Sequence, residues 1–234
     1  MTPQYRLYHA PDNASLVIRL ALEELAVPYD TVLVDRAARA QRSPGYLALN
    51  PVGLIPVLET PDGPIFETGA ILLWLADRHC ALAPRPDHAD RAAALKWLFF
   101  LSNTLHPALR MTFHPEAYAG DDPQAQAALR TRMQACIAGH LDLLDTAAGD
   151  HPGLFSGDNP TVIGLYLGPL LRWMALYPPG QTAWFALHDR PRLAALVTAL
   201  ERRPSVAAAI VAEGLGPAPF TEPRPPDPPH GSAT

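Results

Sequence analysis

The hydrophobic pattern of this chain changes character at Pro84-Arg85-Pro86, and the change limits the folds that the chain can adopt. Before this point, short alternating runs typical of strands are interleaved with runs of helical periodicity. After it, the strand pattern stops and Ala- and Leu-rich helical segments follow. Because prolines interrupt regular structure, we predict two domains, residues 1–83 and 87–214, joined by a short linker.

The order of elements in the first domain predicts an α+β fold. Strands are expected at Tyr5–His9, Tyr29–Val34, Pro56–Glu59 and Pro64–Glu67, and helices at Leu16–Leu25, Ser43–Leu49 and Gly69–His79. In this β-α-β-α-β-β-α order the first two strands should be parallel and the last two should form a hairpin. Ser15 and Thr68 directly precede two of the helices, so each is expected to be an N-cap.

The second domain is predicted to be an all-α bundle that packs against the first. Its helices are expected at Asp87–Phe113, Pro123–Ala148, Pro160–Tyr177, Arg190–Arg202 and Pro204–Glu213. Residues 215–234 hold seven of the 27 prolines in the chain. Since proline lacks a backbone N–H, we expect this stretch to be an extended tail that lies on the surface.

Composition excludes several classes of function. The formal net charge is −5, so no polybasic surface for nucleic acid or anionic lipid is expected. The apolar runs are too short to span a membrane. Cys80 and Cys136 form no CxxC pair, which fits a reducing compartment. The N-terminus lacks a basic segment followed by an apolar run, so we predict a cytoplasmic protein.

Two local patterns are suited to binding an extended peptide with an amino-acid head. A cis bond before Pro56 would turn the backbone of Ile55 outward, where a peptide can pair with it as an added strand, although a trans bond is the commoner state. Glu67-Thr68-Gly69 stands at a predicted helix start, where free N–H groups favour a carboxylate. Glu67 would then meet an ammonium group.

These patterns together resemble the glutathione transferase superfamily. The residues that carry the resemblance are Asn50-Pro51-Val52-Gly53-Leu54-Ile55-Pro56-Val57-Leu58, Phe66-Glu67-Thr68 and Ile71-Leu72-Leu73-Trp74-Leu75-Ala76-Asp77. The resemblance implies a thioredoxin-like N-terminal domain, an all-helical C-terminal domain and a cis bond at Ile55-Pro56. It also implies that glutathione is the co-substrate, bound by Leu54, Ile55, Pro56, Glu67 and Thr68, and that the protein is a homodimer.

The loop before the first helix is expected to carry the group that activates the thiol. The segment resembles that of bacterial β-like transferases, in which a cysteine stands at the position of Ala14. Without it, mixed-disulfide chemistry is not expected, because exchange needs a thiolate. Ser15 and Asn13 are the remaining candidates, since a polar donor and a helix dipole both favour a bound thiolate. Ser15 as a simple cap, and Asn13 as a turn residue, are the alternatives.

The second domain is expected to complete the site with a pocket for an electrophile. His106 resembles a histidine that other bacterial transferases bring over glutathione, and the alternative is a wedge residue before a kink at Pro107. The pocket is predicted to be lined by Tyr8, Phe99, Asn103 and Arg110. His106 and His114 are too far apart around a helix to form a metal pair, so no metal site is expected.

We therefore predict a glutathione transferase that joins the glutathione thiolate to a small hydrophobic electrophile, with a role in detoxification. One rival is a non-catalytic glutathione-binding or scaffold protein that keeps the fold, which Ala14 would favour. A glutathione-dependent reductase is a weaker rival, because no thiol stands near the first helix.

Overall fold

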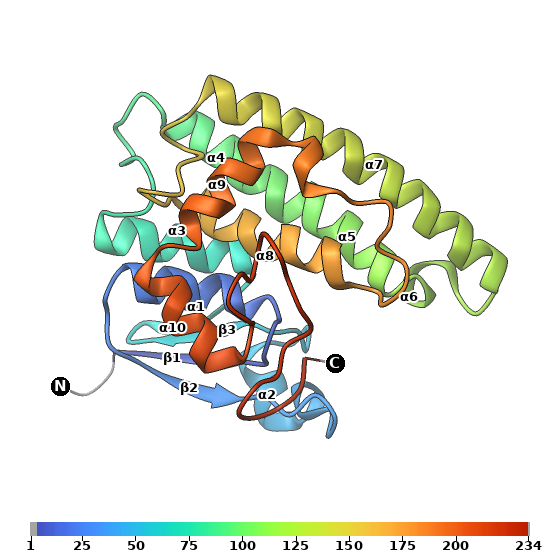
Figure 1. Ribbon diagram of the computed structural model, residues 1–234. Coiled ribbons are helices and arrows are strands. Elements are labelled where there is room, and N and C mark those ends of the chain that lie inside the picture. The colour runs from blue at the N-terminus through green and yellow to red at the C-terminus, as the bar shows by residue number, and fades with distance from the viewer. Residues whose placement is uncertain (1–3, 234) are drawn as a thin grey trace.

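Figure 1 shows the computed structural model, which describes residues 4–233. Residues 1–3, on which part of the prediction about an export signal rests, and residue 234 lie outside the described residues. The described chain starts with mixed strands and helices and continues with helices alone. This is the α+β thioredoxin-like part followed by the helical part that the sequence predicts.

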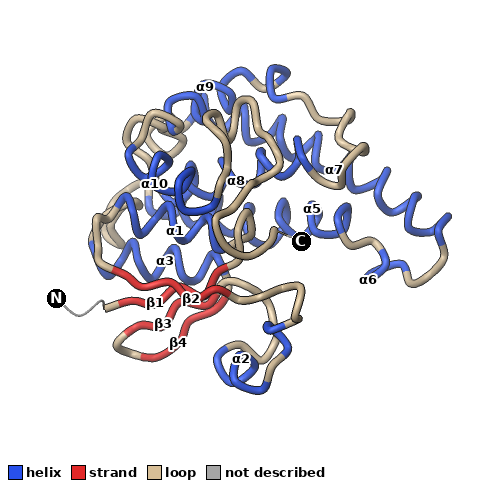
Figure 2. The backbone as a smooth tube through the Cα atoms, turned by 60° about the horizontal axis from the view of Figure 1, so that its bottom comes forward, coloured by secondary structure: helices blue, strands red, loops and turns tan. Residues whose placement is uncertain are grey.

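The first part is a four-stranded mixed sheet with helices on both faces. Its elements are β1 (Tyr5–His9), α1 (Ser15–Glu24), β2 (Tyr29–Leu33), η1 (Ala40–Arg42), α2 (Pro44–Leu49), β3 (Val57–Thr60), β4 (Gly63–Phe66) and α3 (Thr68–His79). The strand order is β2-β1-β3-β4, with β1 and β2 parallel and the other pairs antiparallel. The predicted parallel pair and hairpin are thus confirmed. Helices α1 and α3 cover one face and α2 the other (Figure 2).

The second part contains helices only, among the residues that the structure describes. They are α4 (Arg91–Phe100), η2 (Leu101–Leu105), α5 (His106–Phe113), α6 (Glu116–Ala119), α7 (Pro123–Asp150), α8 (Val162–Leu176), η3 (Leu187–Asp189), α9 (Pro191–Leu200) and α10 (Pro204–Glu213). The predicted segments correspond to these helices with shifted ends. The short α6 and η3 were not predicted, because so few residues carry no periodicity.

The two parts share a continuous hydrophobic core. Buried side chains of α1 and α3 pack in one cluster with those of α4, α5 and α8, and fully buried members include Leu16, Leu72 and Leu167. A smaller cluster of Val34, Tyr46 and Val57 lies on the sheet face that α2 covers. Because protein cores are close-packed, the shared core fixes how the two parts meet.

The predicted caps at Ser15 and Thr68 are wrong. Both residues lie inside their helices, and the cap positions are Ala14 and Glu67, neither of which caps with its side chain. The Ser15 hydroxyl instead donates to the carbonyl of Ala10 at 3.0 Å and accepts from the Ala10 N–H at 3.3 Å. The Ser15 hydroxyl therefore links the helix to the preceding loop, and α1 has no side-chain cap.

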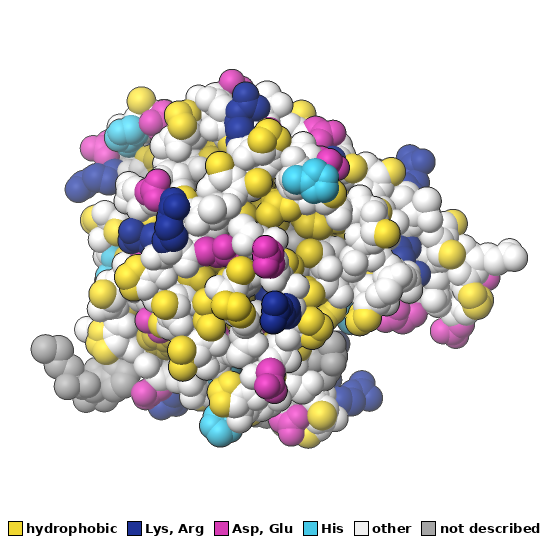
Figure 3. Space-filling view, viewed as in Figure 1, with side chains coloured by type: hydrophobic (Ala, Val, Ile, Leu, Met, Phe, Trp, Pro, Cys, Tyr) yellow, Lys and Arg dark blue, Asp and Glu magenta, His cyan; other side chains and the backbone are white. Residues whose placement is uncertain are grey.

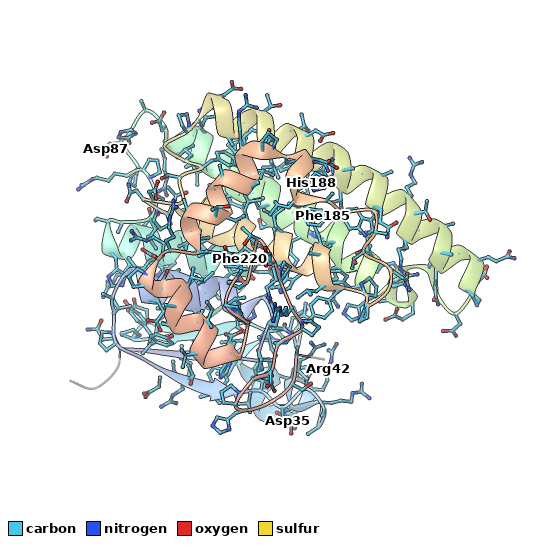
Figure 4. All side chains as sticks on the ribbon, viewed as in Figure 1. Asp35, Arg42, Asp87, Phe185, His188 and Phe220 are labelled. Atoms are coloured by element: carbon cyan, nitrogen blue, oxygen red, sulfur yellow. The ribbon has the colours of Figure 1, made fainter. Side chains whose placement is uncertain are left out.

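The sequence predicts that the C-terminal segment is an extended tail on the surface. Residues 215–233 form no helix or strand and are mostly exposed or half-buried, but a few of their side chains are buried in the protein. Leu215 is fully buried and Phe220 is 2% exposed. Phe220, labelled in Figure 4, packs against Gly168 of α8, where an added Cβ would lie 3.2 Å from the end of its ring. The segment is therefore part of the packed structure.

The surface and helix lengths bear on the excluded classes of function. On the face drawn in Figure 3, basic and acidic side chains are interspersed rather than gathered into a patch of one sign. No helix within residues 4–233 has the length and apolar character needed to cross a bilayer.

Candidate active site

A cavity of about 700 Å³ lies where the two parts of the chain meet. It is lined by the β1–α1 loop, the turn before β3, the start of α3, the face of α5 and the end of α8. Of the residues predicted as site residues, those that line it are Asn13, Leu54, Ile55, Pro56, Glu67, Thr68, His106 and Arg110. The structure thus brings together, at one cavity, predicted site residues from four separate segments of the chain.

The turn before β3 presents Ile55 to the cavity. The Ile55-Pro56 bond is cis, as the resemblance implies. The Leu54 carbonyl accepts hydrogen bonds from the Tyr46 hydroxyl at 2.8 Å and from the Asn50 amide at 2.7 Å. Two donors on one carbonyl hold the turn in place, and the backbone of Ile55 lines the cavity just ahead of the edge where β3 begins.

The start of α3 offers both signs of charge to a ligand. Glu67 has a φ of 72° and stands at the cap position, and no side chain caps the helix. The first N–H groups of α3 are therefore left for a ligand, and the helix dipole adds positive potential there. Gly69 allows a close approach, because an added Cβ would lie 3.1 Å from the Cβ of Ser102, which lines the cavity.

The start of α1 brings Asn13 and Ala14, but not Ser15, to the cavity. Ser15 is fully buried and bonded to Ala10, so it has no access to a ligand. The structure therefore places Ser15 behind the cavity wall, whereas Asn13, the other predicted candidate for activating the thiol, lines the cavity. The backbone carbonyl of Asn13 accepts a hydrogen bond from the Leu16 N–H at 2.8 Å, and α1 has no side-chain cap. The start of α1 thus combines a positive dipole end with an amide side chain.

His106 forms a hydrogen-bonded pair with Tyr166 of α8, with 2.9 Å between Nδ1 and the hydroxyl oxygen. Burial, with a smaller contribution from Arg110, lowers the pKa of His106 to about 4. Burial also raises the pKa of the Tyr166 hydroxyl, which a hydrogen bond with Thr68 partly offsets. At neutral pH the site therefore holds a neutral imidazole beside a neutral phenol.

The outer wall of the cavity is aromatic and cationic. Phe113, Tyr118 and Tyr177 line it, with Arg36 and Arg110 among them. Arg110 donates from Nε to the Tyr118 hydroxyl at 3.2 Å. Burial and the neighbouring Arg110 lower the pKa of Arg36. This wall suits an apolar ring that carries electron-rich or acidic substituents.

Three residues predicted for the electrophile pocket lie elsewhere. The Tyr8 hydroxyl donates to Glu59 at 2.9 Å, and its ring packs against Tyr46 in the small cluster under α2. Phe99 is 51% exposed, and Asn103 is exposed. Neither lines the cavity, because the helix turns them outward while Ser102 and His106 face inward. The structure corrects the prediction for all three.

The sequence missed several residues that line the cavity: Asp12, Arg36, Tyr118, Tyr166, Trp173, Tyr177 and Ala233. Most of these residues lie in segments whose sequence is typical of a buried helix or a loop. None of them belongs to a recognisable motif. Only the fold brings them beside the turn at Ile55. Within the part of the chain that the structure describes, no cluster of His, Cys, Asp or Glu is arranged to hold a metal ion.

Family models match both parts of the chain. The model described as "Glutathione S-transferase, N-terminal domain" matches residues 3–77. The model described as "Glutathione S-transferase, C-terminal domain" matches residues 127–199. The cavity is lined from both matched regions.

Individual proteins are similar along most of their length. Glutathione S-transferase GST-4.5 of Xanthomonas campestris is 29% identical, over 90% of this chain and 99% of its own. The disulfide-bond oxidoreductase YfcG of Escherichia coli is 36% identical, over 79% of this chain and 90% of its own. A sphingomonad glutathione S-transferase solved with glutathione is 30% identical, with a TM-score of 0.71, and covers 90% of this chain and 100% of its own.

Proposed function

This chain belongs to the glutathione S-transferase family, and from that premise we propose how its cavity joins glutathione to a small hydrophobic electrophile. The observation that carries the proposal is the meeting of Ile55, Glu67 and Asn13 at one cavity. Each of these residues suits a different part of glutathione, and the outer wall of the same cavity is left for the second substrate.

Glutathione would lie across the cavity from α3 to α1. The γ-glutamyl carboxylate would accept N–H groups at the uncapped start of α3, and Glu67 would hold the ammonium. The peptide would pair with the backbone of Ile55 as an added strand. This pose is supported by the lining of Leu54, Ile55 and Pro56 along the cavity.

The thiol would then lie at the start of α1. Asn13 and the positive end of the α1 dipole favour the thiolate over the thiol, and so lower the pKa of the bound sulfur. The thiolate attacks the electrophilic carbon, a C–S bond forms, and the leaving group departs with its bonding electrons. The thiol proton passes to solvent. No group beyond glutathione is needed for this step.

The electrophile would lie against the aromatic wall of Phe113, Tyr118 and Tyr177. His106 and Arg110 line the same cavity, where a neutral imidazole and a guanidinium would donate to charge that develops on the electrophile. A small hydrophobic compound with an electron-withdrawing group fits this set of partners.

Conjugation of glutathione to 1-chloro-2,4-dinitrobenzene, followed by absorbance of the product, tests the proposal. We expect turnover by the purified chain above the uncatalysed rate. Reduction of a small disulfide by glutathione should be measured in parallel, because one relative is named a disulfide-bond oxidoreductase. Cys80 and Cys136 do not line the cavity. Glutathione binding without either reaction would instead favour the non-catalytic alternative.

Glu67→Gln tests the proposed grip on the amino-acid head. Loss of the carboxylate removes a charge-assisted bond, so we expect glutathione affinity to fall by about 1 kcal/mol or more, about fivefold, in calorimetric titration. Glu59→Gln is the matched control, because Glu59 pairs with Arg6 on the sheet and does not line the cavity. Equal affinities of the two variants would refute the pose.

Three further properties are proposed from the family resemblance. We expect a homodimer, which light scattering on the purified protein would measure. We expect the protein to act in the cytoplasm, which fractionation of the native cell would test. A role in detoxification predicts that loss of the gene sensitises the cell to electrophiles.

A further inference from the structure

The C-terminal segment, residues 215–233, is bound into the protein through one buried side chain. Arg172 of α8 is fully buried, and its guanidinium donates to the carbonyls of Leu215 at 3.2 Å, Pro219 at 3.1 Å and Arg224 at 2.8 Å. Three carbonyls from a stretch of ten residues, Leu215 to Arg224, converge on one group. The segment is thus bound to α8 through Arg172. Figure 1 shows it as the red loop that passes over α8.

The same guanidinium holds the β1–α1 loop. This loop leads into the start of α1, where the glutathione thiol is proposed to lie (the thiol site). Arg172 donates from Nε to Asp12 Oδ1 at 2.8 Å and from Nη2 to Oδ2 at 3.1 Å. A guanidinium has five N–H donors, so all of them are used by Asp12 and the C-terminal segment. Both side chains of this ion pair are fully buried.

Asp12 ties the loop to further cavity residues. Its carboxylate also accepts the Trp173 indole N–H and the Tyr177 hydroxyl, both at 2.8 Å. Its own N–H donates to Glu213 of α10 at 2.8 Å. Asp12 has a left-handed φ of 49° and is followed directly by Asn13. The conformation of the loop before α1 is therefore set by α8, α10 and the C-terminal segment together.

The far end of the segment reaches the cavity itself. Ala233 lines the cavity, and its carbonyl accepts a hydrogen bond from Arg36, which lines the cavity from the β2–α2 connection. The segment thus runs from the support of the thiol loop at Arg172 to the wall of the cavity at Ala233.

We propose that the C-terminal segment is a structural part of the thiol site and that Arg172 is the positioning residue through which it sets Asn13 and the start of α1. The inference rests on the proposed function, in which the glutathione thiol lies at that helix start. Arg172 does not touch the substrate; it acts by holding Asp12, one residue before Asn13. A displaced loop would present the amide and the helix dipole to the sulfur in a weaker geometry.

The test compares two arginines that each contact a carboxylate through Nε and Nη2. Arg172→Lys keeps the charge but loses the planar fork. Arg203→Lys is the control, because Arg203 makes the same two-pronged contact, to Glu24 at 3.1 and 2.8 Å, away from the cavity. The readouts are the pH midpoint of the bound glutathione thiol, followed by the ultraviolet absorbance of the thiolate, and kcat/KM for conjugation.

For Arg172→Lys we expect the thiol midpoint to rise by about one pH unit and kcat/KM to fall about tenfold or more. Arg203→Lys should keep the wild-type midpoint, even where it melts at a lower temperature. Asp12 keeps a cation beside it in Arg172→Lys. The other charged and titratable groups that line the cavity are the same in both variants: Arg36 and Arg42 of the β2–α2 connection, Glu67 of the α3 start, His106 and Arg110 of α5, His114, Tyr118, Tyr166 and Tyr177. A difference between the variants in the pH midpoint of the bound thiol therefore indicates that the β1–α1 loop has moved. An unchanged midpoint and kcat/KM in Arg172→Lys would overturn the inference.

A second variant decides the matter if Arg172→Lys does not fold. Ending the chain after Glu222 removes the Arg224 carbonyl and the Ala233 wall but keeps the partners at Leu215 and Pro219. We expect a smaller rise of the midpoint in the same direction, and a wild-type midpoint would overturn the inference. Absence of a bound thiolate in the wild-type protein would instead refute the proposed function, and the inference with it.

Discussion

Ser15 and Asn13 stand two positions apart at the start of α1 and have different surroundings. Ser15→Ala leaves the N–H and carbonyl of Ala10 without their buried partner, so we expect a loss of about 1–3 kcal/mol in the free energy of unfolding. The pH midpoint of the bound thiol should stay at its wild-type value. Urea denaturation and the thiolate titration measure the two effects.

Asn13→Ala should give the opposite result. Asn13 lines the cavity, so we expect kcat for conjugation to fall about tenfold, while the unfolding free energy changes by less than about 0.5 kcal/mol. A Ser15→Ala enzyme that loses turnover while Asn13→Ala keeps it would restore the serine as the activating group.

His106 gives the protein a defined dependence of stability on pH. Burial lowers the pKa of His106 to about 4, whereas the unfolded chain holds it near 6.5. Between these values the unfolded state binds more protons, so stability is complete above about pH 6.5 and is lost as the pH falls toward 4. The loss from this group is at most about 3 kcal/mol.

His106→Asn should reduce that dependence, because an amide can still pair with the Tyr166 hydroxyl and does not titrate. Urea unfolding at pH 7 and pH 4.5, without glutathione, measures the difference. His9, whose pKa burial also lowers to about 4, keeps part of the dependence in the variant. Parallel losses in the variant and the wild type would contradict the assignment.

Which site residues the sequence reveals depends on whether their neighbours are local. Ile55 and Glu67 belong to short motifs whose chemistry is complete within a few residues. Tyr166 and Arg36 act only through partners far along the chain, such as His106 and Ala233. The sequence does not indicate that Ser15 is turned away from the cavity. The Ala10 backbone groups that bond its hydroxyl lie in the loop before the helix, and that loop has no periodic pattern.

The helix that carries His106 continues through Pro107 without a break. Residues 91–113 run without interruption, and the turn Leu101–Leu105 is a π-helix directly before Pro107. Proline lacks the N–H that the α-helical pattern requires and crowds the preceding turn. A π-turn widens the helix by one residue, and such turns recur at functional sites. Here it lies beside Ser102 and His106, which face the cavity.

Gly157 lets the loop before α8 pass close to α9. A Cβ at this position would lie 2.1 Å from the carbonyl oxygen of Leu196, which cannot move without bending α9. We expect Gly157→Ala to lower the unfolding free energy by about 3 kcal/mol or more. Gly139→Ala is the control, because an added Cβ in the middle of α7 meets nothing within 4 Å.

For Gly139→Ala we expect a gain of about 0.5–1 kcal/mol, since alanine favours the helix and restricts the unfolded chain. Thermal and urea denaturation of the two variants measure both values. The same shift in both proteins would contradict the steric argument at Gly157.

Arg203 also holds the two parts of the molecule together, whereas its neighbour Arg202 forms an ion pair within the helical part. Arg203 contacts Glu24 of α1, whose carboxylate is 6% exposed, whereas Arg202 pairs with Asp158 on the open surface. We expect Arg203→Ala to lower the unfolding free energy by about 1–3 kcal/mol, because it leaves a buried carboxylate with fewer donors. Arg202→Ala should change it by less than about 0.5 kcal/mol.

The pKa of Glu24 adds a pH test of the same contact. Burial raises this pKa, but hydrogen bonds from Arg203 and Ser205 outweigh it, so the pKa is lowered overall. A lowered carboxyl pKa stabilises the fold above the unfolded value and loses that effect as the pH falls. The Arg203→Ala deficit should therefore shrink in acid. A deficit that stays constant to low pH would contradict the ion pair.

Most of the architecture follows from periodicity, and the exception is the C-terminal segment. Strand alternation and helical spacing predict the four strands and the longer helices. Proline-rich sequence carries no such period, so nothing local indicates that Phe220 is buried or that three carbonyls bind Arg172. Arg172 lies in the apolar helix α8. A charged residue in such a helix indicates that a buried partner exists, but the sequence does not show which residue the partner is.

The placement of Ala233 decides how this protein is best handled in the laboratory. An affinity tag or fluorescent fusion joined close behind Ala233 would adjoin the cavity wall and crowd the space that substrates need. Tyr5, where β1 begins, does not line the cavity. Fusions therefore belong ahead of β1, and kinetic constants obtained with a C-terminal tag would describe an altered enzyme.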